Sequence, residues 1–417
     1  MGNHKKYLYL AAGTVMLLFL GLVYGWSIFR APLTAIFTDW TPTQLSMTFS
    51  ITITCFCIGG FLAGKLAARM KHRFIILLSA ACIFVGYAGI MLLFDENAPG
   101  KTLAVLYIFF GVLGGGGVGL SYNTLLGVIA RWFPGRAGMA SGILLLGFGV
   151  GGLALGSLVS VLSSPDSVGI RSTFLILGVI FAVVLIVGSF FVKIPEAAAP
   201  AKASGADDAA AAPRNFTLGE AVKTGTFWLI FAWTAFMCIG GLLVINSAAP
   251  IAVLFGAPAV MGLIVSVFNG AGRPIIGTIF DKIGRRKTMT INTLIMLVGG
   301  AILILATATG SAAFVFIGLP LIGICYGGTP ALLAASVNKF FGPKYYQVIL
   351  GAVTFSLAVG AIIGPLLSSK LQQASDAEGF GGVYFTSFIL LIVVAAVALA
   401  ITLLISAASK KDGLEDK

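Results

Sequence analysis

The sequence has few charged residues, few histidines and few cysteines, and each shortage excludes a class of function. Only 10% of the 417 residues are charged, and the two histidines, His4 and His72, lie far apart along the chain. Two isolated histidines do not make a histidine-rich metal site. The five cysteines all lie inside apolar runs, which is typical of small buried hydrophobic side chains and not of disulfides or metal ligands. We therefore expect neither a metal nor another cofactor.

Groups that catalyse reactions are also missing from the apolar segments. No histidine and no pair of acids lies at the middle of any of them, where a buried active site would need such groups. We therefore expect that the protein is not an enzyme. The net charge of +12 would suggest a nucleic-acid partner for a soluble chain, but these charges follow a membrane pattern, and we expect no nucleic acid.

Apolar residues dominate the rest of the chain. Hydrophobic residues make up 59% of the sequence, and the mean hydropathy is +1.05. This composition predicts an all-α polytopic membrane protein embedded in a lipid bilayer. Twelve apolar segments are long enough to span the membrane. They lie at about 7–36, 43–69, 73–94, 102–130, 137–163, 171–192, 225–249, 258–283, 288–309, 312–338, 346–370 and 383–406.

The twelve segments divide into two sets of six. Residues 195–220 are rich in Pro, Ala and Asp without apolar periodicity, which predicts a cytoplasmic linker between an N-terminal half, 1–194, and a C-terminal half, 221–417. The halves echo each other, because the turn at 130–136 is similar to the turn at 338–344. Two six-helix repeats predict a substrate site at their interface, near the middle of the bilayer.

Lysine and arginine occupy alternate loops. Apart from two arginines within segments, only Lys101, Arg171 and Lys370 lie on the side opposite to the other cations. Positively charged loops stay on the cytoplasmic side of a membrane. This asymmetry predicts that both termini and the linker face the cytoplasm.

Arg273 is the most informative single residue. Segment 258–283 is apolar around it, and a helix of that length, at ~1.5 Å per residue, crosses a bilayer with some tilt. Arg273 then lies near the middle of the membrane, where its guanidinium stays charged and needs a partner or a water-filled cavity. Its planar fork can hold a carboxylate through two charge-assisted hydrogen bonds. A structural ion pair is the alternative, but no other segment carries an acid at its middle.

Further candidates lie at the depth of Arg273. Asn269 is one turn away on the same helix face. Tyr122 and Leu145 are each nine residues from a basic turn, as Arg273 is from Lys282. The predicted substrate-binding set is Arg273, Asn269, Tyr122, Asn123, Tyr24, Ile28, Leu145 and Tyr326. For the tyrosines, Asn269 and Leu145, ordinary packing inside the bundle is the alternative interpretation.

The turn after segment 258–283 carries a recognisable pattern. It reads G-x-x-x-D-x-x-G-R-R-K from Gly277 to Lys287, and over its whole length the chain resembles the major facilitator superfamily. In that superfamily the aspartate helps to latch the cytoplasmic side closed, so the resemblance implies a gating role for Asp281, Arg285 and Arg286. The first-half copy has Ala68 where the aspartate is expected, which implies a stronger latch in the second half.

Two further stretches narrow the resemblance. Residues 24–32 read YGWSIFRAP and residues 131–134 read RWFP, and both are similar to the bacterial oxalate/formate antiporter family and its lactate and pyruvate relatives. The arginine of the eighth segment is shared with the proton-linked monocarboxylate transporters. In animal members of that group an aspartate lies four residues before the arginine, where this chain has Asn269. The resemblance implies an integral protein of the bacterial inner membrane.

The function that this resemblance implies is secondary transport of a small monocarboxylate such as lactate or pyruvate. Proton symport is expected from the resemblance alone, since no residue of the sequence is visible as the proton carrier. The two halves would rock about Arg273 in an alternating-access cycle. One alternative is exchange of organic anions of the oxalate/formate type. Another is a membrane sensor on a transporter scaffold, without flux.

Overall fold

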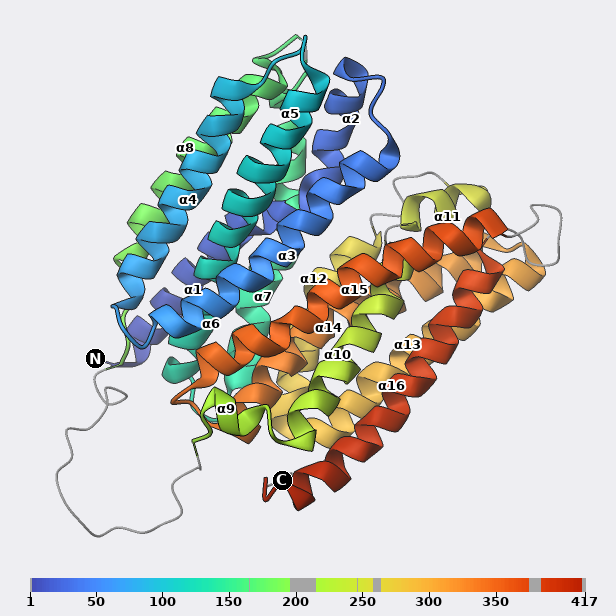
Figure 1. The fold of residues 1–417 in the computed structure, drawn as a ribbon. Helices are drawn as coiled ribbons and strands as arrows, with labels where there is room; N and C mark the ends of the chain where they lie inside the picture. Colours follow the sequence, from blue (N-terminus) through green and yellow to red (C-terminus); the bar gives the residue numbers. More distant parts are fainter. Residues whose placement is uncertain are drawn as a thin grey trace.

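The computed structural model describes residues 2–164, 166–195, 215–245, 247–257, 264–374 and 384–414. Within these ranges every regular element is helical, and no strand is present. Most of the expected linker, 195–220, lies outside the described residues. The described helices form two bundles set at an angle to each other, one from α1 to α8 and one from α9 to α16 (Figure 1).

The first bundle contains six long helical segments, some of them interrupted. In chain order its elements are α1 (Gly2–Leu20), η1 (Gly21–Gly25), α2 (Trp26–Ile36), α3 (Pro42–Leu66), α4 (His72–Leu93), α5 (Pro99–Val105), η2 (Leu106–Gly114), α6 (Gly115–Trp132), α7 (Ala137–Leu162) and α8 (Gly169–Ser189). The strongest packing inside this bundle joins α3 to α6, α4 to α8 and α1 to α7.

The second bundle repeats this plan. Its elements are α9 (Leu218–Ala221), α10 (Gly225–Ile245), α11 (Ala248–Leu254), α12 (Ile264–Ile283), α13 (Arg285–Thr309), α14 (Ala312–Phe341), α15 (Tyr346–Ala374) and α16 (Phe385–Lys411). Here α12 packs on α14, α10 on α15, and α13 on α16. The expected echo between the halves is visible in the turns, since Gly135 and Gly342 have φ values of 79° and 80° in equivalent turns.

The helices bear out eleven of the twelve expected spans. Among the described residues, eleven helical stretches are long and apolar enough to cross a membrane. The remaining expected span, 258–283, corresponds to α12, which is not among those eleven and contains Arg273, Asp281 and Lys282; its first residues, 258–263, lie outside the described part of the structure. The ends of the spans differ from expectation by a few residues. The first span is also not one continuous helix, because the 3₁₀ segment η1 separates α1 from α2, and Gly21 there lies against the backbone of Phe148.

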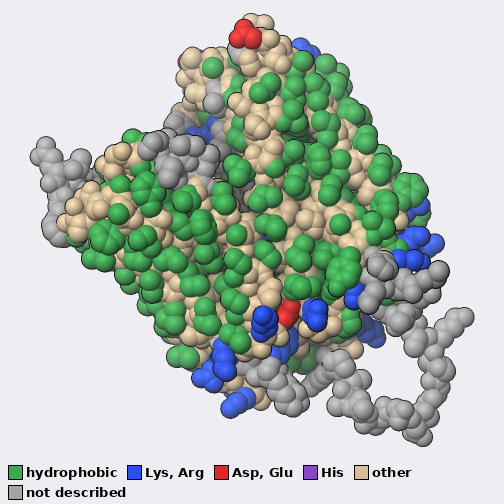
Figure 2. Space-filling view, turned by 180° about the vertical axis from the view of Figure 1, so that it is seen from behind, with side chains coloured by type: hydrophobic (Ala, Val, Ile, Leu, Met, Phe, Trp, Pro, Cys, Tyr) green, Lys and Arg blue, Asp and Glu red, His purple; other side chains and the backbone are tan. Residues whose placement is uncertain are grey.

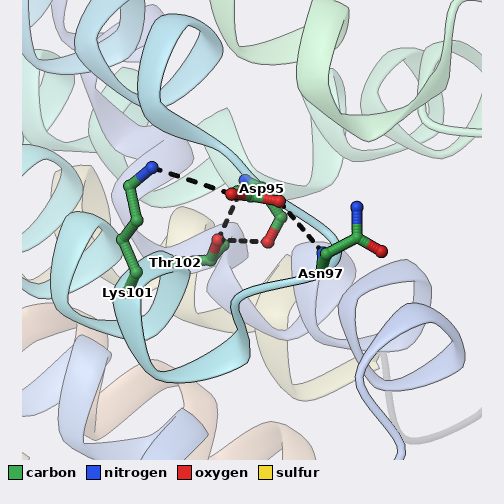
Figure 3. A network of polar contacts seen from close by, with 4 residues as sticks. All are labelled: Asp95, Asn97, Lys101 and Thr102. Carbon is green, nitrogen blue, oxygen red and sulfur yellow. Dashed lines mark hydrogen bonds and ion pairs between the residues drawn. The ribbon is translucent and has the colours of Figure 1, made fainter.

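The two ends of the molecule differ in charge. Lysine and arginine side chains gather at the end where both chain termini lie, which is called the basic end below (Figures 1 and 2). At the opposite end a polar turn joins α4 to α5 (Figure 3). There the hydroxyl of Thr102 donates to the Asp95 carbonyl at 2.8 Å, and Lys101 lies 3.7 Å from the Asp95 carboxylate.

Glycines allow the helices of the first bundle to pack backbone against backbone. An added Cβ at Gly119 of α6 would lie 2.0 Å from the Phe56 carbonyl oxygen of α3, and one at Gly115 would lie 2.4 Å from that of Thr52. Within a bilayer, helices gain little from hydrophobic association and rely on such close packing. The glycine-rich start of α6 therefore has a structural role in joining α6 to α3.

We predict that Gly119→Ala destabilises the protein, because the new methyl group forces α3 and α6 apart. Overpacking of this kind typically costs ~1–3 kcal/mol. The measurement is the thermal unfolding midpoint of the purified protein in detergent. Gly100→Ala is the matched control, since nothing lies within 4 Å of a Cβ at Gly100. Equal midpoints for the two variants would contradict this packing role.

Candidate functional site

Arg273 lies between the two bundles. It belongs to α12 of the second bundle, is 2% exposed, and donates through Nη1 to the Leu145 carbonyl of α7 in the first bundle at 2.6 Å. Its Nη2 lies 3.5 Å from Asn269 Oδ1, one turn back on the same helix. Its Nε has no hydrogen-bond partner among the described residues. The guanidinium is therefore buried, with no ion-pair acid within 4 Å among those residues, and it retains donor capacity.

Two glycines of α7 allow Arg273 to approach. An added Cβ at Gly142 would lie 2.5 Å from the Arg273 carbonyl oxygen, so the backbones of α7 and α12 are in contact there. An added Cβ at Gly149 would lie 2.8 Å from Arg273 Nε. The absence of side chains at these two positions provides the space that the arginine and its guanidinium occupy.

Aromatic rings border the guanidinium on the side of the first bundle. The Phe148 ring lies 5.9 Å from Arg273 Cζ, within cation–π range. The ring centroid of Tyr122 of α6 lies 5.0 Å from that of Phe148 and 4.9 Å from that of Phe56 of α3. Phe148 therefore lies within reach of both the Tyr122 ring and the Arg273 guanidinium. Sequence reasoning missed Phe148, although it lies three residues after Leu145 and therefore on the same helix face.

The other predicted site residues have varied environments. Leu145 contributes its carbonyl, while its side chain is fully buried. Ile28 of α2 is half-buried and points toward Gly156 of α7. Tyr326 of α14 is buried against Gly241 of α10. The side chain of Tyr24 lies outside the described part of the structure.

Asn123 lies in a seam between the bundles, where α3 and α6 contact α15. Its Nδ2 donates to the Gln347 carbonyl of α15 at 2.7 Å and to the Gly60 carbonyl of its own bundle. The Gln347 side chain fills the space beside Gly127, and its Oε1 lies 3.1 Å from His72 Nε2. Sequence reasoning did not select Gln347 or His72. One sequence signal could have pointed to them. Ala68 replaces the aspartate in the first-half turn, so the first half needs a different contact between the bundles at the basic end.

Asp281 forms the corresponding contact in the other seam, where α12 packs on α7. Its carboxylate accepts hydrogen bonds from the backbone N–H groups of Gly138 at 3.0 Å and Met139 at 2.7 Å. These groups belong to the first turn of α7, whose own N-cap residue, Arg136, makes no side-chain cap. An acid from the second bundle therefore caps a helix of the first, where the helix dipole favours a negative charge.

The two arginines that follow Asp281 are placed differently. Arg285 is buried in the second bundle, where its Nη2 donates to Ser406 of α16 at 2.9 Å and its guanidinium lies 5.2 Å from the Phe340 ring of α14. Arg286 is exposed. The contacts described for Arg285 thus fix α13 to α14 and α16, whereas Asp281 reaches the other bundle.

The bundles are in contact at the basic end and diverge toward the opposite end. The contacts of Asp281 and Gln347 both lie near the basic end. Farther along, Gly156 of α7 packs on Ile28 and Gly364 of α15 packs on Ile239, each inside its own bundle. Figure 1 shows α2 and α11 well apart at that end. The described contacts between the bundles are therefore concentrated toward the basic end, and the helix ends α2 and α11 are separated at the opposite end.

Comparisons with known proteins support this architecture. The chain is 29% identical to the oxalate:formate antiporter of Oxalobacter formigenes over 96% of this chain and 91% of that protein. It is 27% identical to monocarboxylate transporter 4 of Rattus norvegicus over 66% of this chain and 59% of that protein. Its fold matches the proton:xylose symporter XylE with a TM-score of 0.70 and 15% identity, covering 95% and 96% of the two chains.

A family model described as Major Facilitator Superfamily matches residues 14–365. Its members are transporters, and the apolar spans described above identify an integral membrane protein. The resemblance first indicated by the turn from Gly277 to Lys287 is confirmed over most of the chain. The protein belongs to the major facilitator superfamily.

Proposed function

We propose that the protein transports a small monocarboxylate of the lactate or pyruvate class, by proton symport with alternating access. The observation that carries this proposal is the position of Arg273, a buried cation between the two bundles with donor capacity to spare. Relatives named for oxalate and formate exchange and for monocarboxylate transport support an organic anion as the substrate.

In the proposed binding mode the substrate carboxylate pairs with Arg273, and Asn269 orients the guanidinium. The hydroxyl or carbonyl group of the substrate meets Tyr122, whose ring is held between Phe56 and Phe148. Asn123 is the other polar candidate, and it becomes available only when its bond to the Gln347 carbonyl breaks. The apolar end of the substrate packs toward Ile28 and Phe148, while Tyr24 and Tyr326 complete the set.

The transport cycle follows from the two seams. We assign the halves 1–194 and 221–417, joined by the linker 195–220, as the units that move. The basic end faces the cytoplasm with both termini, in accordance with the positive-inside rule, and the membrane is the bacterial inner membrane. In that orientation the structure is the outward-open conformer. Asp281 and Gln347 keep the cytoplasmic side closed until the substrate draws the outer ends together.

We predict that Arg273→Lys lowers substrate affinity by roughly ten- to a hundredfold. A lysine cannot reproduce the planar two-bond geometry, and one charge-assisted hydrogen bond is worth ~1.5–3 kcal/mol. The measurement is uptake of labelled lactate into proteoliposomes at matched protein content. Arg171→Lys, an exposed arginine at the opposite end, is the control and retains uptake. Wild-type uptake by Arg273→Lys would rule out the carboxylate role.

We predict that Asp281→Asn and Gln347→Ala each shift the protein toward a conformer open at the basic end, because each removes a contact between the bundles. Spin labels at Lys65 and Lys344, in a background free of native cysteines, report the separation as a distance distribution. For both variants we expect an additional population with a longer distance between the two labels. Asp39→Asn, an exposed acid near the end of α2, is the control. Unchanged distributions would show that neither contact holds the seam closed.

Exchange of organic anions is the second candidate, and the 29% identity to the oxalate:formate antiporter over 96% of the chain favours it. A dianion such as oxalate needs a second cation. In the oxalate-transporting members of the resembled family, a lysine in the eleventh helix can supply that cation. When the glycines of α15 are lined up with that pattern, Leu357 takes about the position of the lysine, and residues 347–369 contain no charge. An oxalate bound at Arg273 would therefore keep one carboxylate buried and unpaired.

We predict that lactate or pyruvate binds much more tightly than oxalate at neutral pH. An unpaired buried charge costs several kcal/mol, or roughly a thousandfold in affinity. The measurement is competition of labelled lactate uptake by unlabelled oxalate, with unlabelled lactate as the reference competitor. Equal competition by the two anions would favour the exchanger.

A further inference from the structure

A large pocket lies at the basic end, away from Arg273. Its volume is about 1130 Å³, and it lies between the two bundles, among the ends of α6, α12 and α14 and the starts of α7 and α13. Its charged lining residues are Arg131, Lys282, Lys287, Lys339 and Asp281. The pocket is called the vestibule below. Figure 2 shows the basic side chains that gather at this end, around a small acidic spot.

The charges of the vestibule are strongly unbalanced. Four cations and one carboxylate line it, and both oxygens of that carboxylate already accept backbone N–H groups of α7. Arg131, Lys282 and Lys287 have no carboxylate within ion-pair distance among the residues that the structure describes. The cations come from both bundles, since Arg131 belongs to α6 and the lysines to the second bundle. The vestibule therefore carries a net positive potential.

Apolar groups form the walls between these cations. Trp132, Phe133, Phe280 and Ile283 line the vestibule together with three prolines. Low-dielectric walls concentrate the field of like charges in a cleft and raise the local concentration of counter-ions. The volume far exceeds that of one small carboxylate, so the vestibule is suited to collecting anions and not to holding one in a single pose.

The vestibule is lined by the end of α12, the helix that carries Arg273. Asp281 is eight residues after Arg273 on α12, which corresponds to ~12 Å along a helix. An anion in the vestibule is thus separated from Arg273 by the capped start of α7.

We propose that the vestibule is a second, cytoplasmic anion site that collects the transported carboxylate and sets its apparent affinity from the cytoplasmic side. This inference rests on the proposed function for the identity of the anion and for the orientation. In this proposal Arg131, Lys282 and Lys287 attract the anion electrostatically at the basic end, whereas Arg273 binds it between the bundles.

The test compares the two sides of the membrane. Lys282→Gln with Lys287→Gln removes two vestibule cations, and Lys410→Gln with Lys411→Gln is the matched control at the exposed end of α16. Lactate transport is measured in inside-out and right-side-out vesicles. The vestibule variant is expected to raise KM roughly three- to tenfold in inside-out vesicles only, and the control is expected to raise neither.

Ionic strength provides an independent check, because salt screens exposed charges. Added salt should raise the inside-out KM of the wild-type protein more than that of the vestibule variant. Equal KM changes from both sides, or equal salt responses, overturn the proposal. A KM defect that appears only in vesicles containing anionic phospholipid also overturns it, because a lipid headgroup would then be the occupant.

A readout without transport separates this inference from the proposed function. Trp132 lines the vestibule, so the difference in fluorescence between the protein and its Trp132→Phe variant isolates its signal. The measured quantity is the ratio of Trp132 quenching by iodide to its quenching by neutral acrylamide. This ratio should be higher in the wild-type protein than in the variant with Lys282→Gln and Lys287→Gln. If lactate transport is absent but the quenching ratio still differs between the two proteins, the substrate assignment fails and the anion site stands. If the quenching ratio is the same in both proteins, the proposed anion site is wrong.

Discussion

The Arg273 guanidinium is buried between the two bundles, and the packing around it must compensate for the loss of water. Moving such an ion out of water costs several kcal/mol even after relaxation. No acid in the described residues neutralises it, and the structure instead supplies the Leu145 carbonyl, the Phe148 ring and the Asn269 side chain. These groups satisfy part of the donor capacity. The remaining donor capacity is what the proposed function assigns to the substrate carboxylate.

The same constraint explains the glycines of α7. Gly142 and Gly149 lie where a side chain would meet Arg273. The lack of side chains there allows both the close approach of α7 and α12 and the position of the guanidinium. The contact also crosses between the bundles. A charge held by both bundles can respond to an anion by altering how they pack, which is what a transporter that alternates between conformers requires.

The two seams at the basic end use different chemistry for the same task. Asp281 caps α7 with a charge, whereas Gln347 binds Asn123 and His72 through neutral groups. Neutral contacts in a buried seam avoid the desolvation of an ion. Burial raises the pKa of the Asp281 carboxyl, and its hydrogen bonds to the Met139 and Gly138 N–H groups and the charge of Arg136 oppose that rise.

The class of protein and most of its spans could be predicted from the sequence, because long apolar runs are local signals. The sequence also predicted a buried charge at Arg273, because that residue lies in the middle of an apolar segment. It also indicated Asp281 through its turn. The groups that meet the guanidinium could not be predicted from the sequence, since Leu145 contacts it through its backbone carbonyl and Phe148 through its ring. The tertiary structure also placed Asn123 with Gln347, more than two hundred residues away, and it assembled the vestibule from cations of both bundles. Such pairings depend on how α6, α7, α12 and α15 pack, and helix periodicity carries no information about which helices become neighbours.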